Sequence, residues 1–215
     1  MLNEGSQFRG KKTLYKVHKL IGKGKSGYSY LADDGLNLFV IKTMHNEHTP
    51  YYNFVGDRLS PEISAFDKLK SAGVRIPRMI EYDLEKNYLV KEYVDGLTGA
   101  EWISKGLQKD NIISELFGIS NMLKKQNLNI DYFPNNFVIS DGQLFYIDYE
   151  INTYIDEWSL ENWGIYYWAN TAGFKDYLST GSALALNSDL EKGIPIKIPF
   201  EVTVREWVKK FSNLK

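Results

Sequence analysis

Residues 129–150 read NIDYFPNNFVISDGQLFYIDYE and contain the most informative polar spacing in the chain. Asp131 is followed five residues later by Asn136 and, twelve residues beyond that, by Asp148. The apolar residues between Asn136 and Asp148 alternate, which predicts a β-hairpin. Three short polar side chains are too few to identify a site by themselves. Their interpretation therefore depends on what the upstream half of the chain supplies.

The upstream half begins with a glycine-rich segment, IGKGKSGYSYLADDGLNLFVIK, at residues 21–42. Gly22, Gly24 and Gly27 form G-x-G-x-x-G, a spacing that dinucleotide-binding folds also use. Those folds need a helix after the glycines, whereas this sequence predicts a strand, a DDG turn and a second strand. A glycine-rich hairpin lets backbone N–H groups lie over phosphates without an intervening Cβ. A Walker A motif is excluded because Lys19 stands where its first glycine is needed.

The second strand of this segment ends at Lys42, and the next predicted helix carries Glu62 twenty residues further on. The helix signals in RLSPEISAFDKLKSAG are a cap at Ser60, Pro61 in the first turn, and Ile63, Phe66 and Leu69 at helical spacing. Taken alone, Lys42 and Glu62 could be any exposed ion pair, of little energetic value.

A further segment, YLVKEYVDG at residues 88–96, is an alternating strand that runs into a turn. With these parts in this order, the chain resembles the protein-kinase-like superfamily from about residue 14 to 170. It is more similar to the small bacterial members and to the aminoglycoside-phosphotransferase and RIO-type branches than to eukaryotic protein kinases. The resemblance implies an α+β, two-lobed protein-kinase-like fold with a small antiparallel-sheet N-lobe and a trimmed helical C-lobe.

The resemblance also implies that ATP and Mg²⁺ are the cofactors and that the γ-phosphoryl group passes to a hydroxyl acceptor. On this reading Gly22, Gly24 and Gly27 cover the phosphates. Lys42 contacts the α- and β-phosphates and is held by Glu62. The acceptor could be a protein Ser/Thr or a small molecule.

The remaining roles that the resemblance implies concern adenine, metal and acceptor. Glu92 to Val94 form the hinge that binds the adenine edge, so Glu92 and Val94 count as nucleotide-binding residues. Asn136 and Asp148 hold the metal, and Asp131 orients the acceptor hydroxyl and receives its proton.

The chain departs from the family pattern around the catalytic aspartate. Asn129-Ile130 replaces the usual His-containing pair, so regulation through a phosphorylated activation loop is not expected. Only seven residues separate Asp148 from Asp156, and no A-P-E follows. We expect Asp156 to start a large buried helix and to support the catalytic loop. The missing peptide platform favours a small acceptor or a protein docked elsewhere, and the alternative function is a nucleotide-binding pseudokinase that acts as an interaction module.

The motifs predict the domain organisation. Residues 1–12 are expected to form a flexible arm, 13–91 the N-lobe, 92–96 the hinge, and 97–215 the helical C-lobe with its catalytic loop at 129–136. Within the C-lobe, an amphipathic helix is predicted over 109–127 and another over 202–211, whereas 171–200 shows no clear period.

Two residue groups outside these motifs have competing interpretations. His45 and His48 share an H-x-x-H spacing, but an ordinary loop explains them better than a metal site. The aromatic cluster Trp158, Trp163, Tyr166, Tyr167 and Trp168 is best explained as the core of a buried helix, with a stacking platform as the alternative.

Bulk composition is that of a globular enzyme. The 215 residues include no cysteine, which excludes disulfides and thiolate zinc sites, and the net charge of −1 predicts no nucleic-acid partner. No apolar run is long enough for a bilayer or for the core of a signal peptide. We therefore expect a cytoplasmic monomer without membrane insertion.

Overall fold

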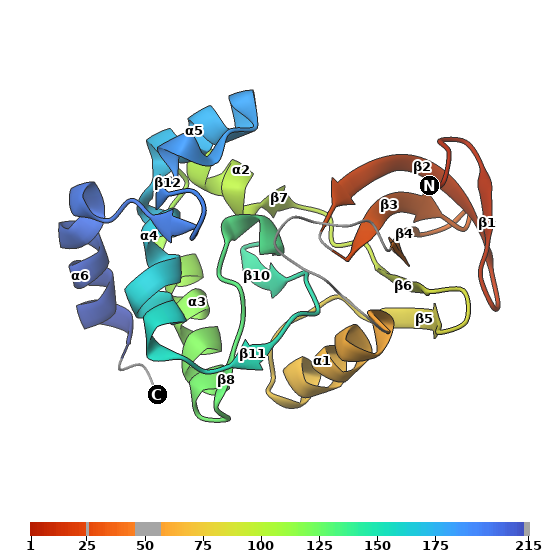
Figure 1. Ribbon diagram of the computed structural model, residues 1–215, viewed down its shortest axis with the longest axis horizontal. Helices are drawn as coiled ribbons and strands as arrows, with labels where there is room; N and C mark the ends of the chain where they lie inside the picture. Colours follow the sequence, from red (N-terminus) through yellow and green to blue (C-terminus); the bar gives the residue numbers. More distant parts are fainter. Residues whose placement is uncertain (25, 46–56, 213–215) are drawn as a thin grey trace. The chain divides into compact units, whose positions relative to one another are not determined.

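The computed structural model describes residues 1–24, 26–45 and 57–212. Contacts divide the chain into two compact units: unit 1 holds residues 1–68 and 77–94, and unit 2 holds residues 69–76 and 95–215. Unit 1 is built on an antiparallel sheet and unit 2 is mainly helical, so the predicted mixed α+β class is confirmed (Figure 1). Within the described ranges, no helix is both long and apolar enough to cross a membrane.

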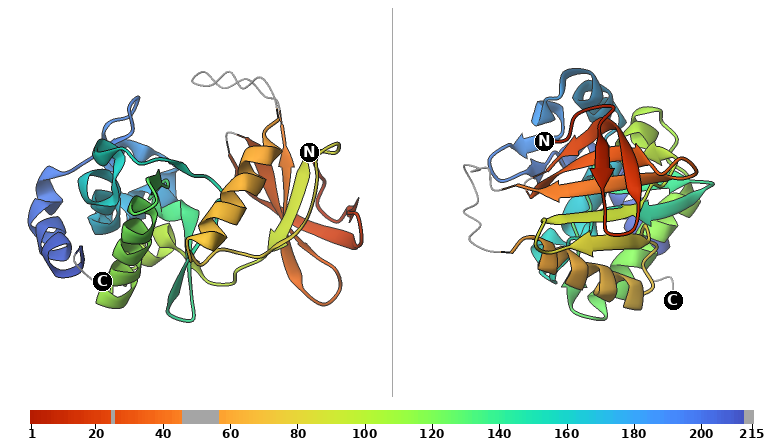
Figure 2. Two further views of the ribbon diagram at one scale, coloured as in Figure 1. Left: turned by 90° about the horizontal axis from the view of Figure 1, so that it is seen from below. Right: turned by 90° about the vertical axis from the view of Figure 1, so that its right-hand side faces the viewer.

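The sheet of unit 1 has six antiparallel strands in the order β1-β2-β3-β4-β6-β5. The strands are β1 Gln7–Arg9, β2 Leu14–Lys23, β3 Gly27–Asp33, β4 Leu38–Met44, β5 Met79–Asp83 and β6 Tyr88–Glu92. The sheet is curled (Figure 2). Successive side chains along a strand point to opposite faces, and apolar side chains of one face form a core. This core consists of Tyr15, Val17, Tyr28, Tyr30, Ala32, Phe39, Ile41, Tyr88 and Val90.

The N-terminal residues are part of this sheet, so the prediction of a flexible arm over residues 1–12 is wrong. β1 pairs with β2, and Phe8 packs edge-on against Tyr88 with ring centroids 4.8 Å apart. The turn after β1 is held by Glu81, whose carboxylate accepts hydrogen bonds from the backbone N–H groups of Lys11 at 3.1 Å and Lys12 at 3.2 Å. A polar segment can join a sheet because strand pairing uses the backbone.

Helix α1, Leu59–Ser71, is the predicted helix that carries Glu62. Its first turn is capped by Asp57 rather than by the predicted Ser60, because Asp57 Oδ1 accepts from the N–H groups of Leu59 at 2.9 Å and Ser60 at 3.1 Å. Hydrogen bonds from Ser60, through its side chain and its backbone, lower the pKa of the Asp57 carboxyl. An ionised carboxylate at a helix N-terminus is favourable.

The segment that follows α1 belongs to unit 2, whereas the sequence assigns it to the N-lobe. Arg75 fixes it there: its carbonyl accepts from Tyr146 N–H at 2.9 Å, and its Nη1 donates to Glu115 Oε2 at 2.7 Å and to the Leu144 carbonyl at 3.1 Å. Residues 69–76 are thus tied to the hairpin of unit 2.

Unit 2 combines helices with short strands. Its elements are β7 Leu97–Thr98, α2 Gly99–Ser104, α3 Asp110–Lys124, β8 Leu128–Asn129, β9 Phe137–Ser140, β10 Gln143–Tyr146, β11 Asn152–Thr153, α4 Ile165–Ala169, α5 Thr171–Thr180, β12 Asn187–Asp189, β13 Ile194–Pro195 and α6 Glu201–Phe211. The predicted hairpin is confirmed as β9 and β10, which turn at Asp141 and Gly142 with φ of 49° and 73°. Positive φ at both positions is the geometry of a tight type I′ turn.

The helices of unit 2 confirm two predictions and correct a third. α3 and α6 occupy the two predicted amphipathic segments, and both contribute buried side chains to one core. The large helix expected from Asp156 is instead broken into a 3₁₀ turn Asp156–Trp158, a π turn Leu160–Gly164, and the helices α4 and α5. Asn170 causes the last break, because its Oδ1 caps Gly173 N–H at 2.8 Å.

Candidate functional site

The glycine-rich hairpin joins β2 to β3, as predicted. A Cβ added to Gly27 would lie 2.7 Å from the Thr43 carbonyl oxygen, so the fold itself requires glycine there. A Cβ on Gly22 or Gly24 would meet nothing closer than 3.8 Å and 3.7 Å respectively, and neither residue has a positive φ. Packing among the described residues therefore gives no reason for glycine at these two positions.

Contacts at the tip of this hairpin hold Gly24 in place. The Gly24 N–H donates to the Gly27 carbonyl at 2.9 Å, and His45 Nε2 lies 3.2 Å from the Gly24 carbonyl oxygen. The His45 ring also packs on Tyr28 with centroids 4.7 Å apart. His48, the second residue of the H-x-x-H pattern, lies outside the described residues.

Lys42 and Glu62 form the predicted ion pair. Lys42 Nζ and Glu62 Oε1 are 2.5 Å apart, and each side chain is only 10% exposed. Lys42 stands in β4 opposite Leu89 of β6, whereas Glu62 lies in the first turn of α1. Ser26 Oγ, next to Gly27, donates to the same Glu62 oxygen at 3.3 Å. One carboxylate thus links a strand lysine, a helix and the glycine-rich hairpin.

The predicted hinge begins inside the sheet, because β6 extends through Glu92. Glu92 N–H donates to the Arg78 carbonyl at 2.9 Å, and Tyr93 N–H donates to the Leu38 carbonyl at 3.3 Å. Both donors are used within unit 1. Among the N–H groups of residues 92–94, that of Val94 makes no hydrogen bond within the described part of the chain, so a ligand could use it.

The second group of predicted residues lies in unit 2, around the 3₁₀ turn Pro134–Asn136. Asp131 is exposed, and its Oδ1 accepts from Phe133 N–H at 2.9 Å. Asn136 Nδ2 donates to the Asp131 carbonyl oxygen at 3.2 Å. These two bonds orient the Asp131 carboxylate and the Asn136 amide relative to each other.

Asp148 is brought beside Asn136 by the hairpin. Ile147 N–H donates to the Asn136 carbonyl at 2.8 Å, directly after the last residue of β10, and Asp148 Oδ1 accepts from Tyr149 N–H at 2.9 Å. Burial raises the pKa of the Tyr146 hydroxyl well above its usual value, and the charges of Asp148 and Asp131 raise it further. Both carboxylates therefore act on one buried phenol at the end of β10.

The donor set around this turn fits a magnesium ion. Mg²⁺ takes oxygen ligands and commonly uses only one or two protein carboxylates together with phosphate oxygens. Asp148 supplies a carboxylate, and the Asn136 amide, with its nitrogen bound to Asp131, offers its oxygen on the other side. Over the described ranges, no three His, Cys, Asp or Glu side chains form a group that could hold a metal ion.

Asp156 does not support the catalytic loop as predicted. Its carboxylate accepts from Tyr154 Oη at 2.9 Å and from Asn162 Nδ2 at 3.0 Å, close to its own turn. Two contacts that the sequence did not suggest reach the loop instead. Trp168 Nε1 donates to the Tyr132 carbonyl at 2.9 Å, and Asn129 Nδ2 donates to the Trp158 carbonyl at 2.8 Å. Only the tertiary contact reveals that an indole N–H has this role.

The aromatic cluster that follows the hairpin divides into two parts. Trp168 and Tyr167 are buried, as a core helix predicts. Trp158 is 45% exposed and stacks on Trp163 with ring centroids 4.1 Å apart. The core interpretation is thus correct for only part of the cluster.

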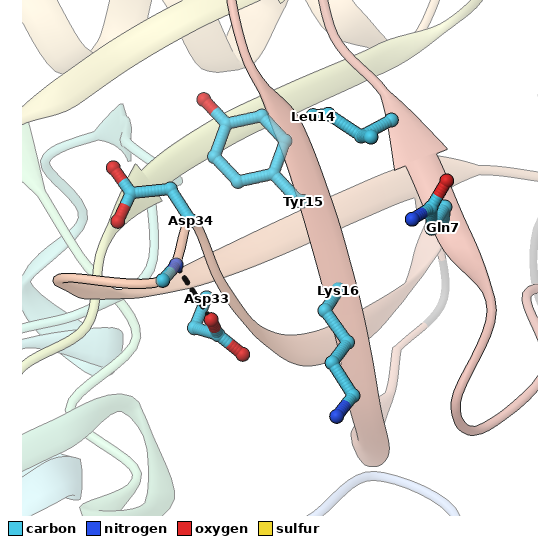
Figure 3. A pocket seen from close by; sticks show the side chains of 7 residues that line it. Gln7, Leu14, Tyr15, Lys16, Asp33 and Asp34 are labelled. Atoms are coloured by element: carbon cyan, nitrogen blue, oxygen red, sulfur yellow. Dashed lines mark hydrogen bonds between the residues drawn. The ribbon is translucent and has the colours of Figure 1, made fainter.

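A pocket elsewhere in unit 1 contains none of the predicted site residues (Figure 3). It is lined by Gln7, Leu14, Tyr15, Lys16, Asp33, Asp34 and Gly35. Asp33 Oδ1 accepts from Gly35 N–H at 2.6 Å across the β3–β4 turn, so this carboxylate is used to hold the turn.

The predicted residues thus form two groups, one within each unit. Unit 1 holds Gly22, Gly24, Gly27, Lys42, Glu62, Glu92 and Val94, and unit 2 holds Asp131, Asn136 and Asp148. In comparisons with known proteins, no family model and no curated protein matches this chain.

Proposed function

We propose that this protein is a phosphotransferase of kinase-like fold that uses Mg·ATP and transfers the γ-phosphoryl group to a hydroxyl. The observation that carries the proposal is the buried Lys42–Glu62 pair beside a glycine-rich hairpin. At two glycines of that hairpin, Gly22 and Gly24, no atom of the described residues lies close enough to exclude a Cβ. A ligand that lies against the backbone would supply a reason for glycine, and phosphates are such ligands.

Stability gives a weak reason for burying this ion pair. Desolvation of two charges cancels much of their attraction, so a buried pair is often no more stable than apolar residues of similar size. A lysine that must contact phosphate has a functional reason to stay charged and oriented. Glu62 can do this because its Oε1 lies 2.5 Å from Lys42 Nζ and both side chains are only 10% exposed.

In the proposed reaction, backbone N–H groups of the glycine-rich hairpin and the Lys42 ammonium bind the phosphates. Asn136 and Asp148 would hold the metal, which would supply positive charge to stabilise the phosphates. The acceptor oxygen forms a bond to the γ-phosphorus as the bond from that phosphorus to the β–γ bridging oxygen breaks, and ADP leaves. Asp131 orients the acceptor hydroxyl and receives its proton.

The acceptor is proposed to be a small molecule or a protein that docks away from a peptide groove. After Asp148 the chain pairs at once with the strand before the catalytic loop: Asn152 of β11 lies opposite Asn129 of β8. The segment after Asp148 is short and pairs with β8, so it gives no platform for an extended peptide.

The second candidate is a nucleotide-binding pseudokinase. It is favoured by Asn129, which stands where the family has His and uses its Nδ2 to bind the Trp158 carbonyl at 2.8 Å. Against it, Asp131, Asn136 and Asp148 are all present, and an interaction module has no chemical need for them.

The test compares wild type with Asp131→Asn. We expect Mg·ATP affinity within a few-fold of wild type by isothermal titration, while ATP turnover, followed as ADP release with and without candidate hydroxyl acceptors, falls about 10²- to 10⁴-fold. Equal turnover in the two proteins would remove Asp131 from the reaction. Binding of Mg·ATP without turnover in wild type would favour the pseudokinase.

A further inference from the structure

The catalytic loop, residues 129–136, is held by a buried hydrogen bond from helix α4. Trp168 Nε1 donates to the Tyr132 carbonyl oxygen at 2.9 Å, and both residues belong to the core, with exposures of 0% and 3%. A buried carbonyl that loses its donor keeps the full cost of its desolvation. This bond therefore strongly favours one placement of the peptide that joins Tyr132 to Phe133.

The same peptide also binds the Asp131 carboxylate. The Tyr132 carbonyl and the Phe133 N–H belong to one planar group, and that N–H donates to Asp131 Oδ1 at 2.9 Å. An unbroken series of bonds thus runs from the indole N–H through a single peptide to the proposed catalytic carboxylate. Hydrogen bonds in such a series polarise each other and strengthen.

Gly164 lets this helix approach the loop. A Cβ added to Gly164 would lie 2.3 Å from Tyr132 Cβ, and Gly164 stands four residues before Trp168, on the same helix face. Gly164 ends the π turn, and its N–H lies 3.3 Å from the Ser159 carbonyl, five residues back. π turns inside helices occur frequently at functional sites.

The loop is also confined from α2. A Cβ on Gly99 would lie 2.5 Å from the Pro134 carbonyl oxygen. Loop atoms on both sides of the Tyr132–Phe133 peptide therefore pack against a glycine. The peptide cannot shift without loss of contacts.

From these contacts we infer that Trp168 is a positioning residue that orients the Asp131 carboxylate through the Tyr132–Phe133 peptide, with Gly164 providing the space. The inference rests on the proposed function for the role of Asp131. Trp168 thereby takes the supporting role that the sequence assigns to Asp156.

The first test replaces the donor and keeps an aromatic ring. Trp168→Phe is compared with Trp102→Phe, since Trp102 lies in the same core, 4% exposed, and its indole makes no hydrogen bond within the described residues. We expect kcat for Mg·ATP hydrolysis to fall about 10²-fold in Trp168→Phe, with the Kd for Mg·ATP within a few-fold of wild type. Trp102→Phe is expected to keep kcat within a few-fold.

The second test moves the loop and leaves the indole in place. Gly164→Ala is compared with Gly118→Ala in α3, where an added Cβ meets nothing within 4 Å. In Gly164→Ala we expect kcat to fall by about as much as in Trp168→Phe. In Gly118→Ala we expect the turnover of wild type. If Trp168→Phe does not fold, the comparison of Gly164→Ala with Gly118→Ala still tests whether the position of the loop controls turnover.

Hydrogen exchange at the Phe133 amide gives a readout that needs no turnover. We expect exchange to be faster in Trp168→Phe than in both wild type and Trp102→Phe. Unchanged Phe133 protection, or equal losses of kcat in each variant and its control, would overturn the inference. If the wild-type protein shows no ATP turnover, the proposed phosphotransferase activity is contradicted instead. The exchange data would still decide whether Trp168 holds the Tyr132–Phe133 peptide.

Discussion

The glycines of the hairpin in unit 1 and those around the proposed catalytic loop, residues 129–136, in unit 2 differ in the space around them. In the hairpin, an added Cβ at Gly22 or Gly24 would meet nothing closer than 3.7 Å. Around the loop, a Cβ at Gly99 or Gly164 would come within 2.5 Å or 2.3 Å of loop atoms. Gly22 and Gly24 leave room that the described residues do not fill, whereas the glycines around the loop make room for the protein itself. Substitutions at the two kinds of glycine should therefore separate ligand binding from stability.

The largest change in stability is expected from the ion pair that anchors the unit 1 group. Lys42→Ala leaves the Glu62 carboxylate buried without its cation, which should lower the free energy of unfolding by about 3–5 kcal/mol. The control is Lys210→Ala: Lys210 Nζ is also 2.5 Å from a carboxylate, that of Asp110, but the two side chains are 57% and 64% exposed. That exposed pair should contribute about 0–1 kcal/mol. Equal losses in urea unfolding of the two variants would contradict a special role for Lys42.

Nucleotide binding should produce the next largest effect. A ligand that binds only the folded protein adds about 2.7 kcal/mol of stability when present at about 100 times its Kd, so Mg·ATP should raise the Tm. Chelation of the metal by EDTA, or the substitution Asp148→Asn, should remove most of the metal-dependent part of this increase in Tm. If the Tm of wild type does not change across millimolar Mg·ATP, the nucleotide hypothesis is wrong for both groups of residues.

The smallest effects are expected from substitutions within the glycine-rich hairpin, where a packed glycine, Gly27, can be compared with an unpacked one, Gly22. Gly27→Ala brings a Cβ to 2.7 Å from the Thr43 carbonyl oxygen and should cost about 1–3 kcal/mol through overpacking. Gly22→Ala should keep the free energy of unfolding within about 0.5 kcal/mol of wild type but weaken Mg·ATP binding. Both quantities come from urea unfolding and isothermal titration of the same samples. A Gly22→Ala protein with wild-type nucleotide affinity would show that its glycine serves no phosphate.

Much of the local structure could be predicted because the signals lie close together in the sequence. The β9–β10 hairpin follows from alternation, and α3 and α6 follow from apolar residues at helical spacing. The Lys42–Glu62 pair was predicted from the resemblance to the protein-kinase-like superfamily, and the ion pair itself is confirmed. The N-terminal strand β1 was missed, since its pairing with β2 depends on backbone groups that a polar sequence does not reveal.

The sequence by itself determined the strands β3, β4, β6, β9 and β10, the helices α1, α3 and α6, and the order of the candidate site residues, because hydrophobic period and short motifs express local physics. Only the tertiary structure decided what holds the catalytic loop. Asp156 has the residue type for that task but bonds to Tyr154 and Asn162, whereas Trp168, thirty-six residues from Tyr132, donates the bond. Which donor reaches a buried carbonyl depends on how a π turn rotates one helix and on whether Gly164 leaves space. Neither follows from residue type or spacing, since both result from packing between segments far apart in the chain.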